Sequence, residues 1–382
     1  MKKFLISLSI IVLVLIVILF VINQDEQQAS IGIVIPPDED TYIADIISSA
    51  VQMVDHSQAA TAPSPYRRDV HAKAHGCVKA TFTVPELSDD RLKKGVFAQP
   101  HQYQAWIRFS SGDTRPQADS IRDARGMAIK LMGVEGEKLL PLEKNEQTQD
   151  FVMINSDVFF IKSVPEYARF MEYQALGSKY GYFFNNFDWN IFKWHLRSFY
   201  LGAKTLKSSP NSLLKEQYHS LSAYRLGDEQ LMKYSAKACP TNQVIDVNDD
   251  NANFLREELS TNLAKNSACF DFMVQLQNPD KYMPVEDTTV RWKPEDSPFI
   301  PVARIEILEQ QFDSEAQNQF CENLSFTPWH SLPALEPVGG INRLRKAVYN
   351  EVSRYRHGKN QQPVFEPKGW CLSLDGTACP AE

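Results

Sequence analysis

Short apolar runs separated by polar residues recur along most of the chain. Beyond residue 66, four of these runs are rich in β-branched and aromatic residues, which is typical of strands. They are CVKATFTV, YQAWIRFSS, RGMAIKLMG and DFVMINSDVFFIK. Two further runs of this kind, CFDFMVQLQ and VARIEILEQ, lie near the C-terminal end. The pattern predicts six strands that contribute to one antiparallel sheet or barrel.

Helical patterns are segregated from the strands. The stretch from residue 165 to about 235 is aromatic and predicted to be helical, and another helix is predicted over residues 341–355. The segment SFTPWHSLPALEPVGG, broken by proline and glycine, is a predicted loop. Strands followed by helices, strands and a final helix indicate the α+β class.

The N-terminus carries nineteen uncharged residues, Phe4–Ile22, after two lysines. A helix of about this length crosses the hydrocarbon core of a bilayer. Secretory signal peptides have shorter apolar regions and a small-residue cleavage site, which this sequence lacks. We predict an uncleaved transmembrane anchor with residues 1–3 in the cytoplasm and the rest outside, or a secreted domain if the segment is cleaved. Residues 23–60 are predicted to be a tether with one short helix over 44–54.

Composition narrows the possible partners. The 382 residues are 43% hydrophobic and carry a net charge of −7, which fits a globular protein and argues against nucleic acid. Any anion site must therefore be a local cluster of basic residues. Of the six cysteines, Cys371 and Cys379 bracket a predicted tight turn that could bring their sulfurs together. None of the six forms a C-x-x-C motif.

The helix NRLRKAVYNEVSRYRHG places Arg345 and Tyr349 four residues apart, on one helical face. Arg356 continues that face seven residues further on. An arginine beside a phenol favours the phenolate, and tyrosine is one of the axial ligands of haem iron. The alternative is an amphipathic surface helix with basic residues in its last turns.

The segment YRRDVHAKAHG contains His71 and, four residues later, His75. His71 could shuttle protons near neutral pH, or it could be structural. A metal pair is disfavoured, because the zinc motif H-E-x-x-H is absent and position 72 is alanine.

The stretch RFSSGDTRPQADSIRDARGMAIKLMG joins two predicted strands through a loop with three arginines. Arg108 and Ser110 share one face of their strand. Together, Arg68, Arg108 and Arg356 could hold a ligand with two carboxylates through forked hydrogen bonds. For each arginine alone, an ordinary surface position is the alternative.

These blocks, in this order, resemble the haem catalase superfamily. The segments R-D-V-H-A-K-A, R-F-S and R-D-A-R-G-M-A-I-K are similar to motifs of that family, and similarity extends over residues 67–356. The resemblance is strongest to the small catalase-related peroxidases. It implies a catalase-type antiparallel β-barrel with peripheral helices over residues 61–360, a Cys-bearing tail over 361–382, and haem, expected to be type b.

The resemblance also implies residue roles. Tyr349 would be the iron ligand, and Arg345 would stabilise its phenolate. His71 would be the distal acid–base group, oriented by Ser110. The haem propionates would be bound by Arg68, Arg108 and Arg356, and Tyr167 would pack on the haem. The loop arginines Arg115, Arg122 and Arg125 would support the barrel itself.

One motif departs from the family pattern. Full catalases have G-N-N-T-P before the F-F pair, and the first asparagine is the partner of the distal histidine. Here the sequence is M-I-N-S-D-V-F-F, so Ile154 takes that place in strict register. Either Asn155 supplies the distal amide from a shifted position, or the amide is absent. Peroxidase turnover is therefore favoured over efficient disproportionation of hydrogen peroxide.

The sequence thus predicts a haem enzyme that reduces hydrogen peroxide or organic hydroperoxides outside the cytoplasmic membrane. It would use an unidentified electron donor and could form a homo-oligomer. Two alternatives are rearrangement of fatty-acid hydroperoxides and a non-enzymatic exported haem carrier or sensor. Retention of both His71 and Tyr349 disfavours the carrier, because carriage needs no proton shuttle.

Overall fold

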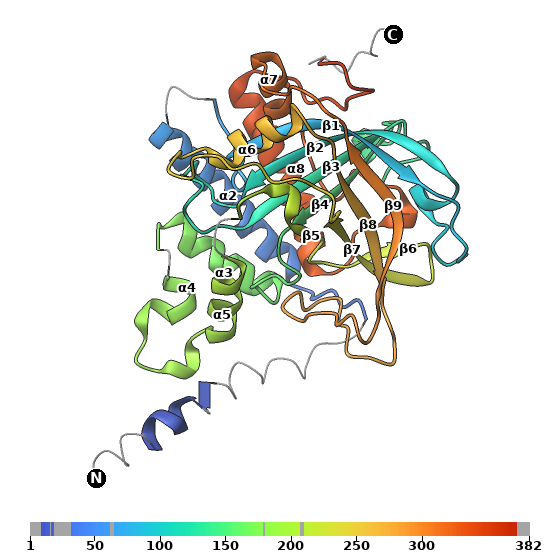
Figure 1. Cartoon of the computed structure of the whole chain (residues 1–382). Coiled ribbons are helices and arrows are strands. Elements are labelled where there is room, and N and C mark those ends of the chain that lie inside the picture. Colours follow the sequence, from blue (N-terminus) through green and yellow to red (C-terminus); the bar gives the residue numbers. More distant parts are fainter. Residues whose placement is uncertain are drawn as a thin grey trace.

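A computed structural model describes residues 9–15, 17–18, 32–61, 65–178, 180–206 and 210–372. Its described strands lie in one antiparallel sheet (Figure 1). They are β1 (Ala74–Val84), β2 (His101–Ser111), β3 (Arg125–Met132), β4 (Thr148–Ile154), β5 (Gln217–His219), β6 (Tyr224–Leu226), β7 (Gln230–Ala238), β8 (Ala268–Leu276) and β9 (Phe299–Ile307).

The sheet closes into a barrel. The strand order is β5-β4-β3-β2-β1-β9-β8-β7-β6, and β5 also pairs with β7, so a ring forms from which only β6 projects. The predicted antiparallel barrel is confirmed. Two details differ: β4 ends at Ile154, well before the end of the predicted run, and three strands occur inside the stretch predicted to be helical.

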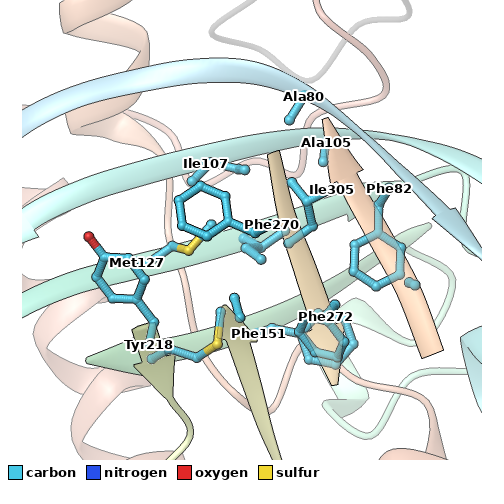
Figure 2. Close-up of a cluster of buried hydrophobic side chains, with 14 of the residues drawn as sticks. Ala80, Phe82, Ala105, Ile107, Met127, Phe151, Tyr218, Phe270, Phe272 and Ile305 are labelled. Atoms are coloured by element: carbon cyan, nitrogen blue, oxygen red, sulfur yellow. The ribbon is translucent and has the colours of Figure 1, made fainter. Parts of the chain in front are cut away.

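The barrel interior is a packed core. Side chains of alternate strand positions, among them Phe82, Ile107, Phe151, Phe270 and Phe272, are fully or almost fully buried and meet inside the ring (Figure 2). Closely packed interiors hold few voids larger than a water molecule. A ligand site must therefore lie outside the barrel, against its wall.

Helices cover the outside of the barrel. They are α2 (Glu39–Thr61), α3 (Val164–Ala175), α4 (Gly181–Phe184), α5 (Leu196–Thr205), α6 (Phe254–Leu263), α7 (Glu315–Asn323) and α8 (Gly340–Asn360), with short 3₁₀ turns between elements. An apolar cluster joins α2, α3 and α8, with Ile46, Val164 and Val348 among its members. The region predicted to be a tether therefore contains a 23-residue helix that packs on the domain.

The C-terminal segment also packs on the barrel. The indole of Trp106 donates to the carbonyl of Gly369 at 3.1 Å, and that of Trp370 donates to the carbonyl of Ala105 at 3.0 Å. Residues 361–372 are thus part of the domain and not a separate tail. Cys371 is disulfide-bonded, and Cys379, its predicted partner, lies outside the described residues.

A second disulfide, which the sequence did not indicate, joins Cys239 and Cys269 at neighbouring ends of β7 and β8. Within the described residues, no helix is long and apolar enough to span a bilayer. The predicted anchor, residues 4–22, lies only partly inside those residues, and it stays a prediction.

Candidate functional site

One large cavity, of about 610 Å³, lies between the outer wall of the barrel and α8. Six of the predicted site residues line it, although they come from distant parts of the sequence. They are Arg68, His71, Arg108, Ser110, Tyr349 and Arg356. The volume suits a small molecule or cofactor. Three predicted residues, Asn155, Tyr167 and Arg345, do not line the cavity.

His71 is held in one orientation. Its Nδ1 lies 2.9 Å from the hydroxyl of Ser110, and its backbone N–H donates to the carbonyl of Gly112 at 3.2 Å. Its φ of 58° is in the left-handed region, where non-glycine residues are uncommon and often functional. A Cβ at Gly126 would lie 2.7 Å from the His71 ring, so a glycine is needed behind the imidazole.

The imidazole of His71 is neutral over the physiological range. Burial lowers the pKa of His71 to about 3, and the positive charges of Arg108, Arg345 and Arg68 add to the shift. The Ser110 hydroxyl can accept a hydrogen bond from Nδ1–H, which leaves the lone pair on Nε2. Among the described residues, Nε2 has no hydrogen-bond partner. It is therefore free to accept a proton from a molecule in the cavity.

Tyr349 reaches the same cavity from α8. The Nε of Arg345 donates to its phenolic oxygen at 3.3 Å, as the four-residue spacing predicted. Burial lowers the pKa of Arg345, but the neighbouring phenols of Tyr349, Tyr224 and Tyr234 outweigh this effect, and its pKa lies above the ordinary value. The guanidinium is thus a fixed positive charge beside the phenolic oxygen of Tyr349.

Three arginines gather where β2, α7 and α8 meet. Arg68 pairs with Glu322 at 3.0 Å, Arg108 donates to the carbonyl of His71 at 2.9 Å, and Arg356 donates to the carbonyl of Glu322. Burial raises the pKa of Glu322, but the three arginines outweigh it and keep that pKa below its usual value. Three guanidiniums against one carboxylate leave a surplus of two positive charges in this group.

The surplus positive charge destabilises the folded chain, and a bound anion would reduce this destabilisation. Arg108 is 3% exposed, and its Nε has no hydrogen-bond partner among the described residues. Burial and repulsion from Arg68 lower the pKa of Arg356 to about 9. Buried charges without partners are strongly unfavourable. Two carboxylates bound here would balance the charge, so these residues fit the propionates of haem.

Ser110, Gly126 and Ile154 form a row across three neighbouring strands, called the distal row below. Ser110 pairs with Gly126, and Gly126 pairs with Ile154, so the three positions share one face of the sheet, and His71 lies against Gly126. Ile154, which strict register of the motif sets at the place of the family's asparagine, therefore lies on this face. The amide of Asn155 is engaged elsewhere: its oxygen accepts from the N–H of Arg125 at 2.8 Å, and its nitrogen donates to Glu216 at 2.7 Å.

Tyr167 lies on α3 and packs against the apolar cluster that joins α2, α3 and α8. Burial, Asp69 and Tyr349 raise its pKa above the ordinary value, which places its phenol near that of Tyr349. It remains a candidate for packing beside the haem edge rather than a residue of the cavity wall. Of the loop arginines, Arg125 is buried and donates to the carbonyl of Asp119 at 2.8 Å, in the supporting role predicted for it.

Sequence reasoning missed Gly126 and Glu322. An isolated glycine inside a strand pattern often marks a close approach, and Gly126 carries that signal. Glu322 has no motif around it. A buried charge network at one end of the cavity was also missed: the amine of Lys130 lies 2.8 Å from Asp150 and 2.5 Å from Glu366, and His330 contacts Asp150 at 2.8 Å.

Comparison with known proteins agrees with this geometry. A model of the catalase family matches residues 46–377. Similar solved structures include a fungal catalase (TM-score 0.63, 19% identity, 85% of this chain and 66% of that chain), a bacterial catalase (0.60, 18%, 82% and 62%) and catalase A from Saccharomyces cerevisiae (0.59, 18%, 80% and 64%). The chain thus spans less than two thirds of the length of these catalases. No curated protein sequence matches it.

Proposed function

The chain belongs to the catalase family, and we propose that it is a haem-dependent enzyme that reduces hydrogen peroxide or organic hydroperoxides. One observation carries the proposal: Tyr349, which is bonded to Arg345 behind it, lines a single cavity together with neutral His71 and a surplus of buried guanidiniums. A haem peroxide enzyme needs an iron ligand, a proton shuttle and a propionate site, and the cavity offers candidate residues for each.

In this proposal Tyr349 ligates the iron, and Arg68, Arg108 and Arg356 bind the propionates. When bound, haem supplies the two-electron redox chemistry with peroxide. His71 accepts the proton of the near peroxide oxygen at Nε2 and returns it to the departing oxygen. Ser110 and Gly126 keep the imidazole in position, and Arg345 keeps a positive charge beside the oxygen of Tyr349.

We propose peroxidase turnover in preference to disproportionation. Ile154 presents only carbon atoms in the distal row, and the amide of Asn155 is bonded away from it. A second peroxide molecule would therefore meet no amide donor beside His71. An external reductant, not yet identified, would supply the electrons.

We further propose that the domain acts at the outer face of a membrane, held by residues 4–22. An aromatic turn supports this location. Phe187, Trp189 and Phe192 are 67%, 100% and 77% exposed. Three successive left-handed residues, 185–187, shape the turn, and Asp188 fixes it by accepting from Asn190 N–H at 2.8 Å. Aromatic side chains exposed in this way favour the membrane interface.

An absorption spectrum of the purified chain, followed by turnover assays, tests the proposal. We expect haem with phenolate ligation, oxidation of a dye donor by peroxide, and little oxygen release. A lipid hydroperoxide is assayed in parallel, and its rearrangement without a donor would favour the alternative enzyme. A chain that binds no haem would contradict the proposal.

A further inference from the structure

Two cysteines with no role in haem binding lie together behind the arginine group. Cys77 on β1 and Cys321 on α7 are both reduced and 3% exposed, and both belong to one apolar cluster. The side chain of Gln317, one helical turn before Cys321, donates to the carbonyl of Cys77 at 2.7 Å. This bond fixes α7 on β1 and holds the two thiols in the same apolar cluster.

The surroundings of the two sulfurs are strongly basic. Cys77 pairs across the sheet with Arg108, so their side chains share one face. Arg68 donates to the carbonyl of Leu324 at 2.5 Å and lies along the last turn of α7. Arginines near a thiol favour the thiolate, which is the nucleophilic form of cysteine.

We propose that Cys77 and Cys321 form a thiol pair that peroxide oxidises to a disulfide, with Cys321 as the attacking sulfur and Cys77 as the resolving one. This site is separate from the haem chemistry and does not require haem. The reductant needed to reset it would be a dithiol.

The two thiols are not equivalent. Burial raises the pKa of Cys321, but the S–H of Cys77 and the charges of Arg108 and Arg68 outweigh burial, and the net shift is downward. Burial and donation to Cys321 raise the pKa of Cys77. We therefore expect Cys321 to attack the peroxide and Cys77 to attack Cys321 afterwards.

The chemistry balances without a further reactant. The Cys321 thiolate attacks one peroxide oxygen, the O–O bond breaks, and the departing oxygen takes a proton to leave as water or alcohol. The sulfenic acid at Cys321 is then attacked by Cys77: the S–S bond forms, the S–O bond breaks, and the proton of Cys77 leaves with the oxygen as water. Two thiols lose two electrons, and one peroxide gains them.

The test measures the oxidation state of each cysteine. The full chain is exposed to hydrogen peroxide and quenched in acid. Remaining thiols are blocked, disulfides are reduced and labelled differently, and peptides are analysed by mass spectrometry. We expect Cys77 and Cys321 to be oxidised to equal extents and to appear as one cross-linked pair. Cys239 and Cys269, already bonded, serve as the internal reference.

Two variants assign the roles. In Cys77→Ala, Cys321 should stop at a sulfenic acid that dimedone traps. In Cys321→Ala, oxidation of Cys77 should slow several-fold, because the thiol that remains is the one whose pKa is raised. The Tyr349→Phe variant should still oxidise the pair, which separates this proposal from the haem proposal. Oxidation no faster than in the unfolded chain, or Cys77 oxidation unchanged in Cys321→Ala, would overturn the inference.

Discussion

At the scale of single residues, Tyr349 carries the cofactor prediction. Tyr349→Phe keeps the ring but removes the oxygen that would ligate iron. We expect haem to be lost, or its absorption spectrum to shift away from phenolate ligation. Tyr355→Phe is the matched control: it lies on the same helix, and its hydroxyl bonds to Asp55 at the surface. An unchanged spectrum in Tyr349→Phe would remove the central claim.

His71 carries the proton-transfer prediction. His71→Ala should keep haem, because Tyr349 and the arginines remain, but lose turnover by about two to four powers of ten. The ratio of peroxide turnover to bound haem measures this. His101→Ala, an exposed histidine at the start of β2, is the control. Near-normal turnover would show that another group moves the proton.

The distal row gives a prediction with two opposed variants. Ile154→Asn places an amide beside Gly126 and His71, and should raise oxygen release relative to dye oxidation. Asn155→Ala should leave that ratio unchanged but lower the free energy of unfolding by about 1–3 kcal/mol, because the N–H of Arg125 loses its partner inside the protein. A changed ratio in Asn155→Ala would return the distal role to Asn155.

Some of these residues could be predicted from the sequence, and others could not. Arg345 and Tyr349 lie four positions apart on a helix, so their contact follows from helical periodicity alone. Neighbouring strand positions face opposite sides, so the sequence also predicts that only one of Ile154 and Asn155 can share the face of Ser110 and Gly126. Glu322 and the pairing of Cys77 with Cys321 depend on how α7 packs on the barrel, and that contact joins segments some 240 residues apart, for which local patterns carry no signal.

At the scale of elements, hydrophobic periodicity identified β1, β2, β3 and α8 but misjudged the region before residue 238. The strands β5 and β6 have only three residues each, too few to establish an alternating pattern. Both depend on pairing with β7, and it is tertiary contact that selects the strand conformation there.

The turn between α4 and α5 gives a prediction at this scale. Replacing Phe187 and Phe192 together by serine removes exposed aromatic surface and keeps Trp189 as the fluorescent reporter, and the fold should keep its stability within about 0.5 kcal/mol. Contact with lipid should weaken. Quenching of tryptophan fluorescence by brominated lipid in vesicles measures this contact, with exposed Tyr282→Ser, in the segment between β8 and β9, as the control. Unchanged quenching, or a changed oligomeric state instead, would contradict a membrane-facing turn.

At the scale of the whole molecule, buried histidines make the stability depend on pH in two directions. Burial and three arginines lower the pKa of His71 to about 3. The stability of the neutral form is present above pH 6.5 and is lost as pH falls toward 3. Burial lowers the pKa of His330, but Glu366 and Asp150 outweigh it and raise the value to about 10. Its stabilisation is complete below pH 6.5 and is lost as pH rises toward 10.

Asp69 partly offsets the loss of stability that the histidines cause at low pH. Burial raises its pKa to about 6, so the folded chain takes up this proton earlier than the unfolded chain does. Between about pH 6 and 4, the proton that Asp69 binds in the folded chain offsets the proton that one histidine binds only in the unfolded chain. His75 again makes stability fall as pH falls, because burial and Arg125 hold its pKa well below the ordinary value. The contribution of the histidines His71, His75 and His330 to stability is therefore greatest near pH 6.5 and falls on both sides.

Difference measurements isolate each histidine. Urea unfolding measures the free energy of unfolding at each pH. Between pH 6 and 4, this free energy should change less steeply with pH in His71→Ala than in wild type, by about 1.4 kcal/mol per pH unit, the contribution of one proton. His330→Gln should flatten the alkaline limb between pH 7 and 9 by a similar slope. It should also lower stability at pH 6.5, since Asp150 and Glu366 lose a positive partner in the buried network. If both variants had the same pH dependence of stability as wild type, His71 would not be held neutral and His330 would not be held charged in the folded chain.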